Sequence, residues 1–178
     1  MLDELTLRTL TMRDLLFSTE HPRLNIGPGM ANLEATLPDT DIKIALDRNI
    51  SAVSWLRGSD NIHLVQAMAE YLPFRDHSLP TVTTQSTFQV MKDQKQFLRE
   101  LERTLTIGGF FCITIEWRVW YQPEKQSFTV YDLSPLQRYM ESQHLKITEI
   151  KYLDNDGKWH DTPDKAFSLW IMGIYNLI

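Results

Sequence analysis

Hydrophobic and polar positions along this chain switch repeatedly between a period of about two residues and a helical period, which predicts strands and helices in turn. Short β-rich apolar runs predict strands at residues 23–26, 42–46, 62–66, 81–85, 110–117, 146–153 and 167–175. Leu and Met at helical spacing predict helices at residues 5–17, 30–37, 50–57, 92–105 and 134–144. The last helix has Ser134 as its expected N-cap and Pro135 in its first turn.

The order of these elements predicts an α/β fold. Strands that alternate with helices favour a doubly wound, mostly parallel, seven-stranded Rossmann-like sheet with helices on both faces. The run 110–117 is apolar on both faces, which predicts a central strand, and a diglycine at 108–109 is expected to close the helix before it. The last two strands are separated by a turn signal at 154–157, which predicts a C-terminal antiparallel hairpin. A ligand is then expected at the carboxyl ends of the parallel strands.

The length of 178 residues predicts one domain, residues 1–178. Within it we expect a short helical lead-in at 1–22, a ligand-binding core at 23–117 and a substrate-side loop, helix and hairpin at 118–178.

Composition and charge narrow the function classes. A net charge of −5 without a basic block argues against binding to nucleic acid. The sequence shows neither a signal-peptide layout nor an apolar stretch of about 18 residues, which predicts a cytoplasmic protein that does not bind membranes. The single cysteine, Cys112, lies in an apolar run and is expected to be buried. The five histidines show no ligand spacing, so no metal is predicted.

The turn Gly27-Pro28-Gly29 follows a predicted strand and opens a predicted helix, so its backbone N–H groups can approach a ligand closely. Asp47 ends the next strand, 18 residues after Gly29, near the spacing at which a carboxylate meets ribose hydroxyls. Asn32 stands where a dinucleotide fingerprint would place its third glycine, which disfavours a nicotinamide cofactor.

Four ordered segments, residues 24–31, 44–49, 68–78 and 97–109, together resemble the motifs of class I S-adenosylmethionine-dependent methyltransferases of the small-molecule type. The resemblance implies S-adenosylmethionine as the cofactor, held by Gly27, Pro28, Gly29, Asp47, Arg48, Met68, Ala69 and Gln85. It implies that the glycines pass close to the methionine part, that Asp47 holds the ribose and that Met68 and Ala69 border the adenine. Gln85 would lie near the transferable methyl.

The chain departs from that family's pattern at four positions: Asn25, Ala31, Met68 and Pro80. Two hypotheses therefore stand. The first is methyl transfer to a small-molecule acceptor. The second is a non-catalytic protein of the same fold that senses the cofactor or serves as an interaction subunit.

The acceptor side is less defined. Within the class of methyltransferases that the chain resembles, enzymes acting on nucleic acids carry a Pro-Pro-aromatic element or a nucleophilic cysteine after the fourth strand. This chain has neither element there, which argues against a nucleic-acid substrate. Glu116 and His77 are candidate general bases by position, but no catalytic residue is assigned. An aromatic segment is expected to form either an apolar acceptor pocket or a packed lid or homodimer contact. Its residues are Trp117, Trp120, Tyr121, Phe128 and Tyr131.

Overall fold

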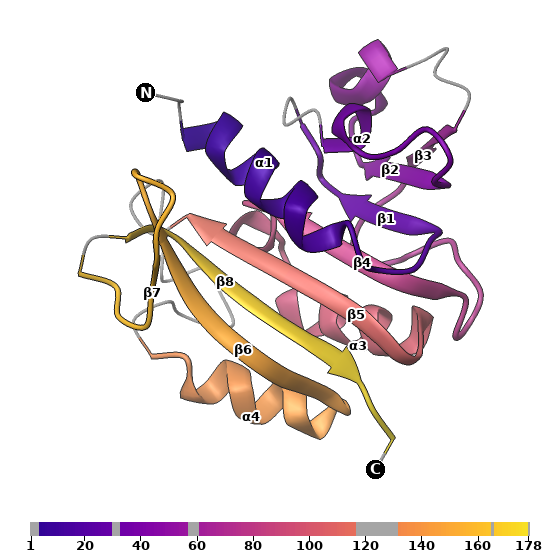
Figure 1. Ribbon diagram of the computed structural model, residues 1–178. Helices are drawn as coiled ribbons and strands as arrows, with labels where there is room; N and C mark the ends of the chain where they lie inside the picture. The colour runs from indigo at the N-terminus through magenta and orange to yellow at the C-terminus, as the bar shows by residue number, and fades with distance from the viewer. Residues whose placement is uncertain (1–3, 30–32, 57–60, 117–131, 165, 178) are drawn as a thin grey trace.

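The chain forms one mixed sheet with helices on both faces, which confirms the predicted α/β fold (Figure 1). This computed structural model describes residues 4–29, 33–56, 61–116, 132–164 and 166–177. The strands are β1 (Arg23–Ile26), β2 (Lys43–Asp47), β3 (Ile62–Gln66), β4 (Leu79–Gln85), β5 (Leu105–Glu116), β6 (Leu145–Asp154), β7 (Trp159–His160) and β8 (Ala166–Tyr175). The helices are α1 (Glu4–Leu16), α2 (Leu33–Thr36), α3 (Gln94–Thr104) and α4 (Ser134–Ser142), with 3-10 turns η1 (Ile50–Leu56) and η2 (Phe88–Val90).

The sheet has the strand order β3-β2-β1-β4-β5-β8-β6-β7. Strands β1 to β5 run parallel, and β8 pairs antiparallel with both β5 and β6. The strand 110–117 was expected to be central, and β5 does lie inside the sheet between β4 and β8. All five parallel strands therefore point their carboxyl ends to one edge, where a ligand site is expected.

The described part of the chain contains eight strands, not the seven predicted. The additional strand is β7, two residues long, which pairs with Tyr152 and Leu153 of β6. The turn at 154–157 consequently joins β6 to β7 and not to β8, because the Asp154 carboxylate accepts the N–H groups of Asp156 and Lys158 at 2.9 Å each and reverses the chain there.

The two faces of the sheet are covered by different helices. On one face Phe97 and Leu101 of α3 and Met140 of α4 pack against the odd-numbered residues of β5. On the other face Met12 and Leu16 of α1 pack with Cys112 and with Trp170 of β8. Figure 1 shows α1 lying along this second face. Cys112 is fully buried as predicted, and burial raises the pKa of its thiol, so it stays protonated and inert.

Two predicted boundaries and one predicted helix were wrong. The diglycine does not end α3, because β5 already begins at Leu105 and contains Gly108 at φ +79°. Residues 50–56 form a 3-10 turn in place of an α-helix, since the sequence there combines β-branched and Ser residues with low helix propensity. Ser134 lies inside α4, where its N–H donates to the Asp132 carboxylate at 2.9 Å, and Leu133 is the N-cap.

Pro80, one of the departures from the family pattern, lies within β4. The pairing of β4 with β5 shifts register between Leu79 and Thr81, so the strand accommodates a residue that has no N–H to donate. None of the helices in the described part of the chain is long and apolar enough to cross a membrane.

We expect acid to destabilise the β6–β7 turn. Nε2 of His160 lies 2.6 Å from the Asp154 carboxylate, and this hydrogen bond, aided by the two N–H donors, lowers the pKa of Asp154 to about 2. A carboxyl whose pKa is lower in the folded state than its ordinary value of about 3.9 stabilises the fold above that ordinary value. This stabilisation should be lost as the pH falls from about 4 through about 2.

Urea unfolding at several pH values tests this. Asp154→Asn should weaken the dependence of the free energy of unfolding on pH between about 4 and 2. Asp164→Asn, which removes an exposed carboxylate from the next loop, is the charge-matched control. An equal pH dependence in the wild type and Asp154→Asn would contradict the assignment.

Candidate cofactor site

A cavity of about 310 Å³ opens at the carboxyl ends of β1, β2 and β3. Four segments of the described chain form its walls, namely the turn after β1, the turn after β2, the loop after β3, and the segment from Thr87 to the start of α3. The lining residues are Ile26, Gly27, Leu46, Asp47, Arg48, Asn49, Ala67, Met68, Ala69, Glu70, Thr87, Val90, Met91 and Lys92. Five of the eight predicted cofactor residues, Gly27, Asp47, Arg48, Met68 and Ala69, therefore line one cavity.

The turn after β1 requires glycine at its first position. Gly27 has φ +65°, and its N–H donates to Leu46 O at 2.8 Å. The hydroxyl of Thr87 lies 3.0 Å from Gly27 O, and a Cβ atom on Gly27 would come within 2.2 Å of Thr87 Oγ1. The lack of a side chain thus lets Thr87 fold over the turn. The other two residues of the turn, buried Pro28 and Gly29 at φ +53°, follow directly but do not line the cavity.

The second wall carries a carboxylate. Asp47 is half-buried at the end of β2, and its Oδ1 accepts the N–H of Asn49 at 2.8 Å, which orients the side chain. The side-chain amide of Gln66 donates to Arg48 O at 3.1 Å and ties this turn to β3. An ionised carboxylate at a cavity wall can accept two hydroxyl protons from a ribose.

The third wall is the loop after β3. Met68 is 39% exposed and Ala69 is buried, so the cavity has an apolar side there. Glu70 is buried, and its carboxylate accepts the N–H groups of Lys92 at 3.0 Å and Asp93 at 3.4 Å. Glu70 thereby joins the loop to the residues that precede α3. The sequence did not single out Glu70, Thr87 or Lys92 as ligand-site residues, and only the fold shows that they face this cavity.

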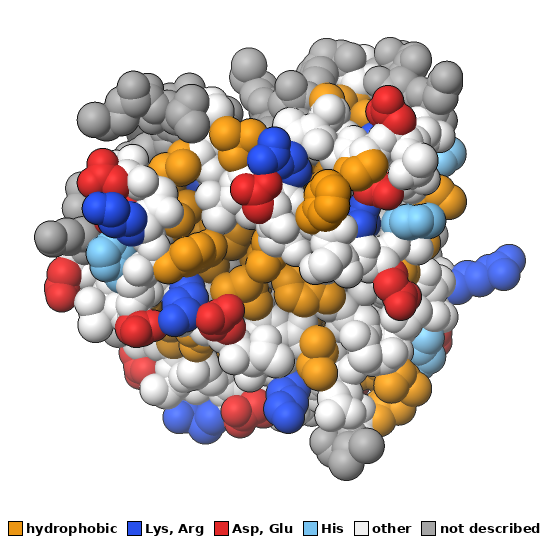
Figure 2. All heavy atoms as spheres, in the orientation of Figure 1, with side chains coloured by type: hydrophobic (Ala, Val, Ile, Leu, Met, Phe, Trp, Pro, Cys, Tyr) orange, Lys and Arg blue, Asp and Glu red, His pale blue; other side chains and the backbone are white. Residues whose placement is uncertain are grey.

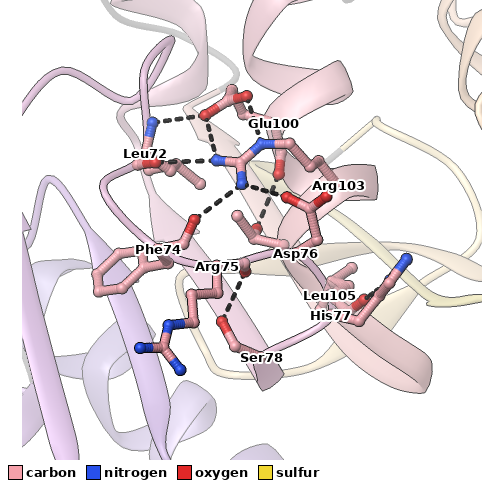
Figure 3. Close-up of polar contacts among 10 residues, drawn as sticks. Leu72, Phe74, Arg75, Asp76, His77, Ser78, Glu100, Arg103 and Leu105 are labelled. Carbon is pink, nitrogen blue, oxygen red and sulfur yellow. Dashed lines mark hydrogen bonds and ion pairs between the residues drawn. The ribbon is translucent and has the colours of Figure 1, made fainter.

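The continuation of this loop is held by Arg103 of α3 (Figure 3). Its guanidinium donates to Leu72 O at 2.9 Å and to Phe74 O at 2.8 Å, and it pairs with the carboxylates of Glu100 and Asp76 at 2.8 Å each. Glu100 in turn accepts the Leu72 N–H at 2.7 Å. The hydrogen bond to Glu100 is the main cause that raises the pKa of Arg103, and it also lowers the pKa of Glu100. This network, the Arg103 clamp, fixes the segment 72–76 against α3.

Asn25, where the family pattern has an acidic residue, is accommodated by a buried partner. Its side-chain N–H donates to the Glu34 carboxyl at 2.8 Å beneath the glycine turn. Glu34 is 1% exposed, and burial raises the pKa of this carboxyl. A carboxyl group is therefore present beside position 25, supplied by α2. Ala31, another departure, lies outside the described residues.

The remaining candidates fall elsewhere. Gln85 is buried at the end of β4 but does not line the cavity. His77 precedes β4 and contacts Leu105 O at 3.1 Å, so it lies at the amino ends of the strands, away from the cavity. Glu116 lies at the carboxyl edge and pairs with Arg8. The aromatic residues expected on the acceptor side (Trp117, Trp120, Tyr121, Phe128, Tyr131) lie outside the described residues.

Comparison with models of protein families shows to which family the chain belongs. The family model described as "Methyltransferase domain" matches residues 24–113, half of the chain, and spans β1 to most of β5. The chain belongs to this methyltransferase domain family. The resemblance drawn from the four sequence segments is thereby confirmed.

Curated relatives agree with this assignment. The ubiquinone/menaquinone biosynthesis C-methyltransferase UbiE of Cronobacter sakazakii is 26% identical over 74% of this chain and 50% of its own length. The same-named protein of Hahella chejuensis is 46% identical over 28% of this chain and 20% of its own length. The chain thus spans at most about half the length of the curated relatives that it matches.

Two solved structures share the fold at low sequence identity. The putative methyltransferase from the Haloferax volcanii complex with the Trm112 methyltransferase activator is 17% identical with a TM-score of 0.73, and the match covers 97% of this chain and 90% of that one. The YcgJ protein of Bacillus subtilis is 17% identical with a TM-score of 0.69, and the match covers 95% and 98% respectively. At such identities these likenesses establish the fold alone.

We expect the Arg103 clamp to stabilise the cavity wall. Arg103→Met keeps most of the apolar stem but removes the guanidinium that donates to the Leu72 and Phe74 carbonyls and to the Glu100 carboxylate. The free energy of unfolding should fall by about 2 kcal/mol, as is typical when buried or part-buried hydrogen-bonding groups lose a charged partner. Amide hydrogen exchange in residues 68–78 should accelerate at the same time.

Arg99→Met is the matched control, because Arg99 lies on the same helix and its guanidinium makes solvent-exposed hydrogen bonds to Gln96 and Tyr139. It should change stability by no more than about 0.5 kcal/mol. Equal effects of the two substitutions would mean that the clamp contributes nothing beyond a surface arginine.

Proposed function

We propose that this chain binds S-adenosylmethionine in the cavity beside Gly27 and catalyses methyl transfer to a small-molecule acceptor. The observation that carries the proposal is the meeting of a side-chain-free turn at Gly27 and the carboxylate of Asp47 at the ends of adjacent parallel strands, in a member of the methyltransferase domain family.

The residues present fit this cofactor. The backbone of Gly27 lines the cavity and can contact the methionine part, and Asp47 can accept hydrogen bonds from the ribose hydroxyls. Met68 and Ala69 provide apolar contact for the adenine, with Arg48 at the rim and Pro28 and Gly29 shaping the turn. Met68 cannot accept a hydrogen bond from the adenine amino group as a carboxylate would, which weakens binding by about 1 kcal/mol.

The chemistry makes modest demands on the protein. S-adenosylmethionine supplies an electrophilic methyl group on a sulfonium, and no metal is needed for its displacement. The task of the chain is to hold the acceptor in line with that methyl group and to keep both in a fixed orientation, which can itself supply a large part of the rate enhancement. Gln85, buried at the end of β4, is in our proposal the predicted residue nearest the transfer.

A small acceptor fits the surface better than a nucleic acid does. The net charge is −5, and Figure 2 shows acidic and basic side chains interspersed over the described residues of one face, without a basic stripe there. The relatives named as biosynthetic C-methyltransferases agree with small-molecule chemistry. The non-catalytic alternative was based in part on Asn25, which replaces an acidic residue of the family pattern. This argument is weakened because Glu34 places a carboxyl group next to Asn25.

Calorimetric titration of the purified chain with S-adenosylmethionine and S-adenosylhomocysteine tests the proposal. Asp47→Asn retains an oxygen for the Asn49 N–H but removes the charge that the ribose hydroxyls contact. Its Kd for either compound should rise at least tenfold, because loss of a hydrogen bond to a charged group costs about 1.5–3 kcal/mol.

Asp39→Asn, at a fully exposed carboxylate before β2, is the control and should leave both Kd values unchanged. If the wild type binds neither compound, the catalytic proposal is wrong. If Asp47→Asn and Asp39→Asn bind alike, the cofactor does not use Asp47.

A further inference from the structure

A second group of polar residues adjoins the cofactor cavity at the same edge of the sheet. The connection is the segment 85–87: Thr87 lines the cavity, whereas the hydroxyl of Ser86 faces α1 and accepts a hydrogen bond from Arg8 Nη1 at 2.5 Å. Ser86 has φ +52°, and its N–H donates to Thr114 O at 3.0 Å. The consecutive residues Ser86 and Thr87 therefore face the Arg8 side and the cofactor side respectively.

Arg8 anchors a carboxylate at this edge. Its Nη2 lies 2.7 Å from Glu116 Oε1, and its guanidinium carbon lies 5.7 Å from the centre of the Phe167 ring. The Arg8 side chain is only 6% exposed, and that of Glu116 is 23% exposed. The Arg8 charge is thus paired within the protein. The Glu116 carboxylate remains partly exposed at the end of β5, and its pairing with Arg8 holds it in one orientation.

Buried polar atoms without a partner lie beside this pair. Both side-chain amide atoms of Gln85 are buried and make no hydrogen bond with the described residues, and neither does the hydroxyl of Ser168. Gln85 pairs in register with Thr114, and Glu116 pairs with Ser168, so these side chains share the face of the sheet that α1 covers. Buried polar groups are almost always hydrogen-bonded, so this cluster indicates a partner that the described chain does not supply.

We propose that Gln85 and Glu116, positioned by Arg8 and Ser86, bind a neutral hydroxyl group of the acceptor; this rests on the proposed methyltransferase function. A hydroxyl can donate to the Glu116 carboxylate and accept from Gln85 Nε2, which gives that buried N–H donor a partner. A carboxylate acceptor is disfavoured, because Glu116 repels it and the Arg8 charge is already paired. An ammonium group is disfavoured because Arg8 and Glu116 together carry no net charge.

The subsite orients the acceptor and does not specify which of its atoms is methylated. Its place next to Thr87 brings a hydroxyl-bound molecule to the end of β4, beside the cofactor cavity. Arg8 and Ser86 are positioning residues in this proposal, since they act through Glu116 and the backbone of segment 85–87.

Ligand-observed NMR titration with phenol, anisole and benzoate, in the presence and absence of S-adenosylhomocysteine, tests the subsite. Phenol should bind the wild type at least fivefold more tightly than either of the other two probes. Gln85→Leu should abolish this preference while leaving the melting temperature unchanged or raised, because the leucine removes buried amide atoms that have no partner. Glu116→Gln should also reduce the preference, whereas Arg13→Gln, at an exposed pair on the same helix, should preserve it.

Equal affinity for phenol and anisole, tightest binding of benzoate, or no binding of any probe would overturn the proposal. Retention of the phenol preference in Gln85→Leu would overturn it too, as would a lowered melting temperature, which means that water or another part of the chain satisfies the amide. Loss of S-adenosylhomocysteine affinity in Gln85→Leu without loss of phenol preference would place Gln85 on the cofactor side alone. Because phenol is also titrated without the cofactor product, failure of cofactor binding and failure of the subsite give different results.

Discussion

The site depends first on the parallel pairing of β1 with β2 and β4. Ile26 is in register with Leu46 on one side and with Thr84 on the other, so three chain segments leave the sheet at the same level. This register brings together Gly27, Asp47 and the segment 85–87, which are far apart in the sequence. A slip of one residue would turn every side chain of a strand to the opposite face, and the buried contacts on both faces oppose such a slip.

Once the strands are aligned, the cavity is shaped by hydrogen bonds between distant loops. The Thr87 hydroxyl donates to Gly27 O, and the Glu70 carboxylate accepts the N–H groups of Lys92 and Asp93. Arg103 donates to the carbonyls of Leu72 and Phe74, in the loop that continues from the cavity wall. Backbone groups in loops that pack against protein need such partners, since leaving them buried and unpaired would cost more than the net gain of a typical hydrogen bond. The walls of the cavity are therefore fixed before any ligand binds, which reduces the ordering cost of binding.

The N-terminal helix is part of the core and not merely an approach to it. Met12 and Leu16 are fully buried against Trp170 and Cys112, which covers the face of the sheet opposite α3 and α4. The same helix carries Arg8 to the carboxyl edge, where it meets residues from β5 and from the end of β4. Residues 4–16 thereby connect the packing of the antiparallel half of the sheet, around β8, with the polar groups beside the cofactor cavity.

The sequence by itself determined the elements whose cause is local. Strand alternation, the glycine turn at Gly27 and the strand end at Asp47 follow from side-chain pattern and backbone freedom, and they were sufficient to predict the fold class and five residues that line one cavity. The ends of elements were predicted less well: the start of β5, the 3-10 turn at 50–56 and the cap of α4 depend on competing hydrogen bonds within a few residues. Only the tertiary structure decided which distant side chains meet, as Arg103 meets Leu72, Thr87 meets Gly27 and Arg8 meets Glu116. Such contacts depend on sheet order and on the direction of each side chain, and no periodicity along the chain encodes either.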